Sequence, residues 1–133
     1  MAKKERNDVM DTVVGLRDAG MTGRINNSAL LALSEEALAH FWQARPQMEV
    51  EPDFRPTKFE CRLYDALKPG DLVRFTVSVD KIGGKSAGFA IAVDCNRTRA
   101  ADLEIIWTAV NPETAEPVAL PEVLRDWLYQ YLP

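Results

Sequence analysis

Two adjacent carboxylates, Glu35 and Glu36, stand inside an apolar stretch of the chain, in the segment GMTGRINNSALLALSEEALAHFW at residues 20–42. Burying a carboxylate is costly unless it is paired or protonated. A desolvated and well-held carboxylate, however, is suited to attack a carbonyl carbon or to activate water for that attack. Upstream, the Asn-Asn-Ser sequence at residues 26–28 favours the start of a helix, where backbone N–H groups stabilise negative charge on an oxygen atom. The segment therefore places a candidate base or nucleophile and a candidate oxyanion site on one predicted helix.

This helix is predicted to run from about residue 26 to Ala44, because Pro46 prevents its continuation. Its apolar residues cover more than one face of the helical wheel: they are Leu30, Leu31, Leu33, Ala37, Leu38, Phe41 and Trp42. A helix that is apolar on so many sides must be buried, and we expect a sheet to wrap around it.

The segments that flank the helix are predicted to supply this sheet. Five of them have β-rich composition or alternate apolar with polar residues: Val9–Arg17 and residues 58–63, 72–80, 85–94 and 102–110. Gly83-Gly84 predicts a hairpin turn, and Pro121 is expected to open a short amphipathic helix. The predicted fold class is α+β, with a long central helix wrapped by an antiparallel five-stranded sheet and followed by a short C-terminal helix. We expect the last four strands to form a meander.

Composition limits the function further. A chain of 133 residues, 47% of them hydrophobic, is expected to form a single domain over residues 1–133. A net charge of −4 argues against nucleic acid or an anionic membrane as the main partner. The start, MAKKERND, lacks the apolar core of a signal peptide, and Cys61 and Cys95 match no metal or redox spacing. These features predict a cytoplasmic protein without a metal site.

The order of these elements resembles the hotdog-fold acyl-CoA thioesterases of the 4-hydroxybenzoyl-CoA thioesterase type. Members of that family carry D-x-D-x-x-G-H-V-N-N before a helix that contains F-E-E-A-R. Here residues 18–27 read DAGMTGRINN and residues 34–38 read SEEAL. Residues 67–93, LKPGDLVRFTVSVDKIGGKSAGFAIAV, and residues 110–128, VNPETAEPVALPEVLRDWL, resemble the later strands and the end of the family. The resemblance extends from about Val9 to Leu128.

This chain departs from the family pattern at the positions that matter most. Gly20 replaces the second aspartate, which many members use as nucleophile or base, and Arg24 replaces the histidine. In another branch of hotdog thioesterases, the working carboxylate lies about two turns inside the long helix and a backbone N–H at the helix start polarises the carbonyl. Glu35, eight residues after Asn27, matches that placement.

We therefore expect Glu35 to be the catalytic carboxylate or else a glutamate at a buried edge, and Asn27 to lie at the oxyanion site. Two other carboxylates are weaker candidates: Glu36 can pair with His40 and face solvent, and Asp18 can serve either catalysis or a turn. Substrate contacts are expected from residues around the helix start and from the hairpin, where coenzyme A phosphates would need basic groups: Gly23, Arg24, Asn26, Ser28, Lys85 and Ser86.

The resemblance implies hydrolysis of an acyl-CoA thioester, with no cofactor beyond the coenzyme A of the substrate. It also implies self-association as a dimer or tetramer, with the active site between subunits. Two alternatives stay open. The loss of the loop aspartate at Gly20 is compatible with a non-catalytic acyl-CoA-binding protein. A hydratase or dehydratase is disfavoured, because the helix entrance carries no histidine.

Overall fold

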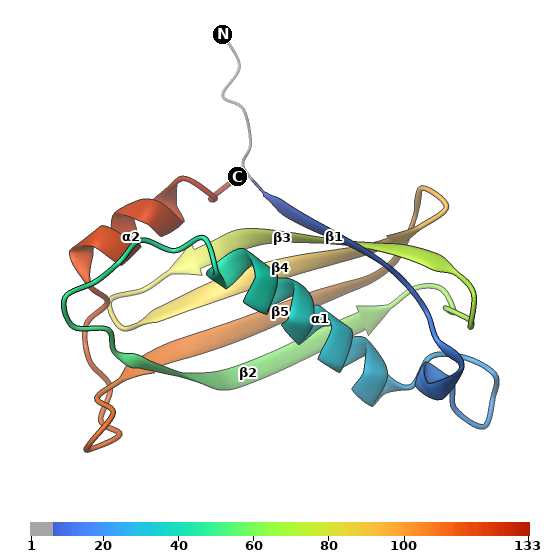
Figure 1. Cartoon of the computed structure of the whole chain (residues 1–133), viewed down its shortest axis with the longest axis horizontal. Coiled ribbons are helices and arrows are strands. Elements are labelled where there is room, and N and C mark those ends of the chain that lie inside the picture. The colour runs from blue at the N-terminus through green and yellow to red at the C-terminus, as the bar shows by residue number, and fades with distance from the viewer. Residues whose placement is uncertain (1–6) are drawn as a thin grey trace, which may run out of the picture.

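The computed structural model describes residues 7–133 and shows a curved sheet that wraps around one long helix (Figure 1). The charged residues 1–6, on which the expectation about a signal peptide partly rests, lie outside this range. The elements in chain order are β1 (Asp8–Val13), a 3-10 turn η1 (Leu16–Asp18), α1 (Asn27–Trp42), β2 (Asp53–Leu63), β3 (Leu72–Ile82), β4 (Ser86–Cys95), β5 (Thr98–Val110) and α2 (Glu122–Tyr129). The predicted fold class is confirmed, although the first strand ends at Val13, before the predicted Arg17.

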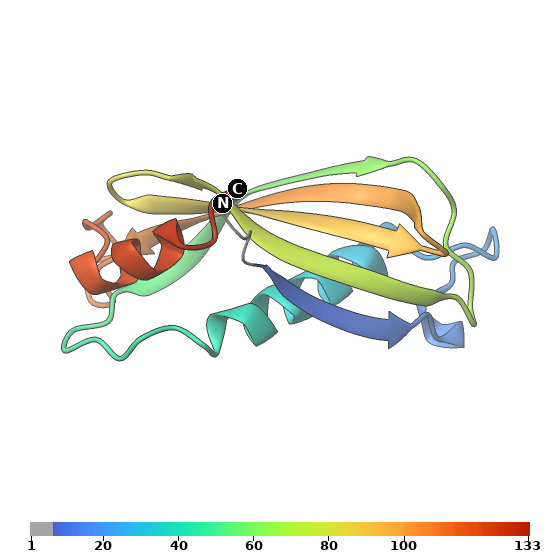
Figure 2. The same ribbon diagram turned by 90° about the horizontal axis from the view of Figure 1, so that it is seen from above.

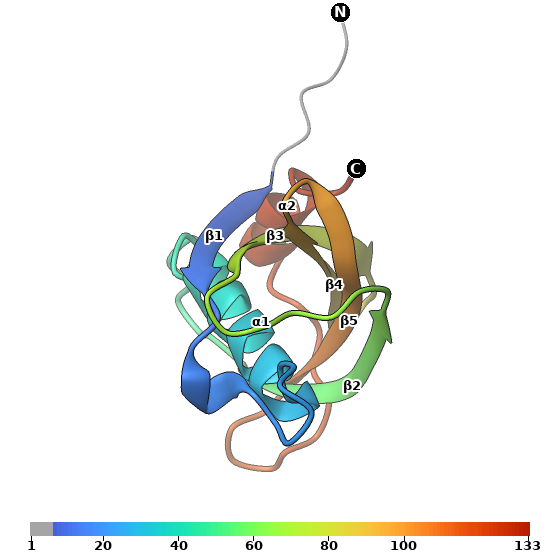
Figure 3. The same ribbon diagram turned by 90° about the vertical axis from the view of Figure 1, so that its right-hand side faces the viewer.

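The strands form one antiparallel sheet in the order β1-β3-β4-β5-β2. Only β3, β4 and β5 form a meander, so the prediction of a four-stranded meander that includes residues 58–63 is wrong. β2 pairs with β5, with Phe59 opposite Ile105 and Cys61 opposite Leu103. The alternation of β2 fixes which residues share a face, but it does not specify the neighbouring strand. Viewed end-on, the five strands curve around α1, with β1 and β2 at the two edges (Figure 3).

The core lies between the concave face of the sheet and one side of α1. Val73, Phe75, Val77 and Val79 of β3 are all buried, as their alternation predicts. The buried residues of α1 are Leu30, Ser34, Ala37, Leu38 and Phe41. The buried hydroxyl of Ser34 donates a hydrogen bond to the carbonyl of Leu30 at 2.8 Å. The helix is therefore buried along one stripe, and its opposite side is exposed in the single chain.

Aromatic contacts join the end of α1 to α2, which lies at one end of the sheet (Figure 2). The ring of Phe41 stacks on Trp127 with centroids 4.9 Å apart and meets Tyr131 edge-on, also at 4.9 Å. It approaches Phe89 of β4 at 6.0 Å. Such pairs contribute beyond the apolar area that they bury. Neither helix in the described part of the chain has the length and hydropathy to cross a membrane.

Candidate active site

A tight loop sets the position of the start of α1. The N–H of Gly20 donates to the carbonyl of Arg24 at 2.7 Å, and the N–H of Gly23 donates to the carbonyl of Gly20 at 3.0 Å. Gly23 has φ of 75°, a conformation that glycine adopts readily. The N–H of Asn26 then donates to the carbonyl of Asp18 at 2.7 Å, which ties the two ends of the loop together. Asn26 is thereby held at the position just before the helix.

Asn26 occupies the N-cap position but does not act as a side-chain cap. Its backbone is extended, with φ of −69° and ψ of 147°, and its side chain makes no capping hydrogen bond. Instead, its carboxamide oxygen lies close enough to Gly20 to clash with a Cβ atom added there. The N–H groups of the first helical turn, which begins with Asn27, thus have no side-chain cap and can bind an oxygen atom from outside.

The carboxylate of Asp18 has a structural contact. Its Oδ2 atom accepts a hydrogen bond from the N–H of Gly15 at 2.9 Å, across the short η1 turn. Asp18 is half-buried and fixes the conformation of this turn.

A groove of about 230 Å³ opens beside the uncapped helix start. Asn27, Leu30 and Leu31 form its helix side, and Leu103 and Ile105 of β5 are buried beneath it. Its outer wall is the face of β2 that looks toward α1, made by Phe59, Cys61 and Leu63. The groove is therefore lined mainly by apolar side chains.

The outer wall of the groove is partly exposed, because α1 does not cover it. Phe59 is 48% exposed and Leu63 is 51% exposed. Cys61, between them, is also exposed. Loss of water contacts around the thiol, and secondarily the nearby carboxylate of Asp102, raise the pKa of Cys61 above its ordinary value. The thiolate form of Cys61 is thereby disfavoured.

Glu35 and Glu36 are both exposed in the single chain, so this chain alone does not bury the carboxylate of Glu35. Glu35 follows Leu31 by four residues and precedes Trp42 by seven. Residues at these spacings share one flank of a helix, and Leu31 places that flank beside the groove. Glu35 therefore lies on the β2 side of α1.

Glu36 belongs to the opposite flank. His40, one turn further along, does not pair with Glu36 as expected; its Nδ1 atom lies 2.6 Å from Oδ2 of Asp8 on β1. Glu36 therefore faces solvent on the side of the helix away from the groove.

The structure separates some of the predicted site residues. Asn27 and Glu35 are eight residues apart, which corresponds to about 12 Å along the helix axis. Lys85 and Ser86 lie at the β3–β4 hairpin, at the opposite end of the sheet from the helix start. The ten residues of β4 separate the two ends, a length of about 30 Å. Arg125 of α2 donates to the carbonyls of Gly83 and Gly84 at 3.2 and 3.3 Å and anchors this hairpin.

Arg24 is exposed and remains near the helix start, as does Ser28 in the first turn. Arg24 and Lys68 line a hollow of about 420 Å³ together with Asp65 and Asp71. Arg24 thus supplies a basic residue three positions before Asn27, although carboxylates share its hollow.

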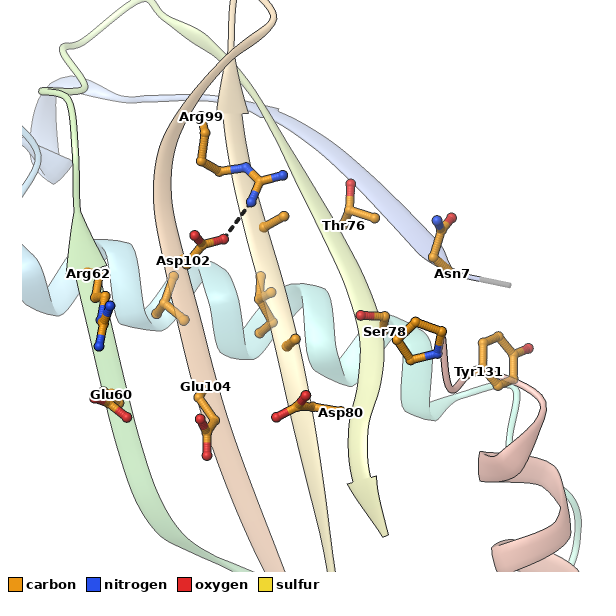
Figure 4. A pocket seen from close by; sticks show the side chains of 15 residues that line it. Asn7, Glu60, Arg62, Thr76, Ser78, Asp80, Arg99, Asp102, Glu104 and Tyr131 are labelled. Carbon is orange, nitrogen blue, oxygen red and sulfur yellow. Dashed lines mark hydrogen bonds and ion pairs between the residues drawn. The ribbon is translucent and has the colours of Figure 1, made fainter. Parts of the chain in front are cut away.

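A second hollow, of about 480 Å³, lies on the outer face of the sheet and was not expected from the sequence (Figure 4). Its walls carry charges of both signs, and Arg99 pairs with Asp102 at 2.6 Å and with Asp94 at 2.9 Å. The Oε1 atom of Glu104 is shielded from solvent without a hydrogen bond and lies 3.5 Å from Nζ of Lys58. This hollow is charged and faces away from α1. The groove at the helix start therefore fits an ester carbonyl with an apolar substituent better than this charged hollow does. Within residues 7–133 no cluster of side chains suited to holding a metal ion is found.

Comparisons with known proteins identify the architecture. The sequence matches no protein-family model and no curated protein sequence. The structure, however, is similar to many solved proteins. A protein of Staphylococcus aureus solved with CoA has a TM-score of 0.87 at 13% identity, over 100% of this chain and 90% of that one. A 1,4-dihydroxy-2-naphthoyl-CoA thioesterase from Synechocystis has a TM-score of 0.82 at 10% identity, over 93% and 96% of the two chains.

This chain has the hotdog fold. A thioesterase from Thermus thermophilus, solved with coenzyme A and zinc, shares it with a TM-score of 0.79 at 23% identity, over 91% of this chain and 96% of that one. At these identities the likeness establishes the fold of this hotdog chain.

Proposed function

We propose that this hotdog protein hydrolyses the thioester bond of an acyl-CoA and releases a free acid and CoA. The observation that carries the proposal is the uncapped start of α1, which opens onto an apolar groove of about 230 Å³. A site for an acyl thioester needs free N–H groups and an apolar groove, because the carbonyl oxygen gains negative charge during attack and the acyl group is apolar. The similar structures named as thioesterases, and those solved with CoA, support the same reaction.

In the proposed reaction the backbone N–H of Asn27 donates to the thioester carbonyl oxygen. The carboxylate of Glu35 removes a proton from a water molecule, whose oxygen attacks the carbonyl carbon. The C–S bond then breaks, and the proton passes from Glu35 to the sulfur of the departing CoA. Alternatively, Glu35 attacks the carbonyl directly and water hydrolyses the resulting anhydride. Both routes need the carboxylate close to the helix start and shielded from solvent.

A second copy of the chain supplies both conditions in this proposal. β2 lies at an edge of the sheet, with no strand beyond it among the described residues. An exposed edge of eleven residues is a surface for pairing with another strand. Antiparallel pairing of two β2 strands about a two-fold axis would join the sheets and place the two α1 helices antiparallel on the same side.

The spacing along α1 suits such a dimer. With the two-fold axis at the level of Leu31, Asn27 of one helix lies opposite Glu35 of the other, because each is four residues from Leu31. Each site would then combine the helix start of one chain with the glutamate of the second chain. Because the sheets are antiparallel, the second chain would also turn its Lys85 and Ser86 toward the first chain's helix start, where coenzyme A phosphates need contacts.

The second candidate function is binding of acyl-CoA without hydrolysis. It is favoured by the loop, where Gly20 replaces the family aspartate and Asn26 fills the space. Hydration or dehydration chemistry is less suited to this chain, because His40 lies near the far end of α1 and pairs with Asp8.

Release of CoA from a panel of acyl-CoAs, followed with a thiol reagent, tests the proposal. Asn27 is the first residue of α1, a position that accepts proline, and the extended backbone of Asn26 suits a residue before proline. Asn27→Pro therefore removes one N–H with little effect on the helix, whereas Asn27→Ala keeps that N–H. We expect Asn27→Pro and Glu35→Gln to lower kcat by about 100-fold or more, with Asn27→Ala near wild type. Wild-type protein that binds acyl-CoA without releasing thiol would establish the binding function instead.

A further inference from the structure

The groove at the helix start also indicates which acyl groups it accepts. We infer that the groove selects a compact, uncharged hydrocarbon acyl group, and that Cys61 and Phe59 on β2 set the size of the acyl group that fits. This inference rests on the proposed hydrolysis. Hydroxylated and charged acyl groups are disfavoured.

The chemistry of the lining carries the first part of this inference. Apart from Asn27 at the helix start, the side chains that face the groove from α1, β2 and β5 offer no strong hydrogen-bonding group; they are Leu30, Leu31, Phe59, Cys61, Leu63, Leu103 and Ile105. Glu60 and Glu104 border the groove, but both approach Lys58 and line the hollow on the outer face of the sheet. Their carboxylates are therefore directed away from the groove.

Once the proposed second chain covers this groove, a polar acyl group would lose water there without gaining a partner from the groove lining, because the second chain's Glu35 would lie at the carbonyl end beside Asn27. Burying an unpaired hydroxyl costs free energy, and burying an unpaired carboxylate costs more. No basic side chain borders the groove to offset such a charge. The expected preference over a hydroxylated acyl group is about 10- to 100-fold, the range typical of an apolar pocket, and the preference over a carboxylated group is larger.

The volume of the groove supports the inference that the acyl group is compact. Pockets that enclose drug-sized ligands measure about 300–1,000 Å³, whereas this groove measures about 230 Å³. It is large enough for an acyl group but too small for a whole acyl-CoA, so the coenzyme must lie outside it. Cys61 lies opposite Leu103 in the register of β2 and β5, between the larger side chains of Phe59 and Leu63 on the same face. A larger side chain at position 61 would fill the middle of the groove.

Cys61 itself is not expected to attack the thioester. Desolvation and the carboxylate of Asp102 raise the pKa of its thiol, and a neutral thiol is a poor nucleophile. A neutral cysteine packs as a small apolar residue. Cys61 is thus a size-determining position in the wall and also a built-in reporter of groove occupancy.

The test compares kcat/KM for butyryl-, octanoyl-, benzoyl-, 4-hydroxybenzoyl- and succinyl-CoA. For the wild type we expect benzoyl-CoA to exceed 4-hydroxybenzoyl-CoA by at least tenfold and succinyl-CoA to be the poorest. Cys61→Phe should lower kcat/KM for octanoyl- and benzoyl-CoA by at least tenfold relative to butyryl-CoA, and Phe59→Ala should shift the optimum toward longer chains. Cys61→Ser, of similar size, is the matched control and should retain the order. Equal rates for the hydroxylated and plain esters, or an unchanged order in Cys61→Phe, would overturn the inference.

A second readout does not depend on activity. In a Cys95→Ser, Glu35→Gln background, which should not turn the ester over, octanoyl-CoA should protect Cys61 from a maleimide by at least fivefold relative to desulfo-CoA, which has no thiol to consume the reagent. If octanoyl-CoA protects Cys61 but the wild type releases CoA from no ester, the proposed hydrolysis is refuted and the proposed acyl groove is still supported. Hydrolysis of octanoyl-CoA with no protection of Cys61 would refute the acyl groove and leave the hydrolysis standing.

Discussion

The carboxamide oxygen of Asn26 occupies the space that a Cβ atom on Gly20 would need. The absence of a side chain at Gly20 therefore allows this close contact, and the backbone of Gly20 is not left-handed. Gly20 stands where the hotdog thioesterases that this sequence resembles carry an aspartate, so a side chain at this position and the present position of Asn26 exclude each other.

A double-mutant cycle tests this exclusion. Gly20→Ala should lower the free energy of unfolding by about 1 kcal/mol, the low end of overpacking costs, because the clashing atom is the end of the exposed Asn26 side chain. In an Asn26→Ala background the same change should cost much less, because the clashing oxygen is gone. Asn26→Ala alone should cost less than a typical N-cap loss of about 1 kcal/mol, since Asn26 makes no capping hydrogen bond. Urea unfolding of the four proteins gives the coupling, and an equal cost of Gly20→Ala in both backgrounds would contradict the contact.

Mixing two inactive variants tests whether the site is shared between chains. Asn27→Pro and Glu35→Gln should each be nearly inactive as pure proteins. In a shared site, a heterodimer of the two variants has one site with both groups intact, so equal mixing with subunit exchange should restore about a quarter of wild-type activity. If Glu35 served the helix start of its own chain, no site in the mixture would be complete and activity would stay at the level of the separate variants.

Self-association through β2 makes a separate prediction. Sedimentation velocity at micromolar concentration should show at least a dimer. Leu63→Glu should lower the dimer fraction, because Leu63 is 51% exposed at the end of β2 and a charge there opposes pairing of the edge. Leu16→Glu is the control, since Leu16 is 85% exposed but lies in the η1 turn. A monomeric wild type, or an equal effect of both variants, would exclude this interface.

The reactivity of Cys61 should depend on pH in a defined direction. A raised pKa means less thiolate at neutral pH, so in the Cys95→Ser background maleimide labelling should be slow at pH 7 and should accelerate at higher pH than for a free thiol. Asp102→Asn removes the smaller of the two causes and should move the profile to lower pH, though not to that of a free thiol. Asp80→Asn, another carboxylate on the outer hollow, should leave the profile in place.

The junction of α1 and α2 should contribute strongly to stability. Phe41 is 2% exposed and contacts Phe89, Trp127 and Tyr131. Phe41→Ala should lower the free energy of unfolding by about 3–5 kcal/mol and change the fluorescence of the nearby tryptophan. Phe54→Ala, at a half-buried ring that contacts Trp42 at 5.0 Å, should cost less. Chemical denaturation of both variants checks the order.

The sequence by itself determined the elements and the fold class. The alternation in Val73–Val79, the Gly83-Gly84 turn and the polar start before Leu30 are local patterns, and the structure contains the corresponding strand, hairpin and helix. Such patterns act within a few residues, because they reflect side-chain direction and backbone conformation. Their order was sufficient to indicate a hotdog fold.

Only the tertiary structure decided what these elements cover. The same alternation that directs Phe59 and Leu63 inward could not show that α1 leaves them exposed, nor that β2 joins β5 at an edge. The apolar surroundings of Glu35 in the sequence did not make it buried, since the helix packs along a single stripe. These outcomes depend on contacts between segments far apart in the chain. A local alternation of apolar and polar residues carries no information about which distant segment packs against it.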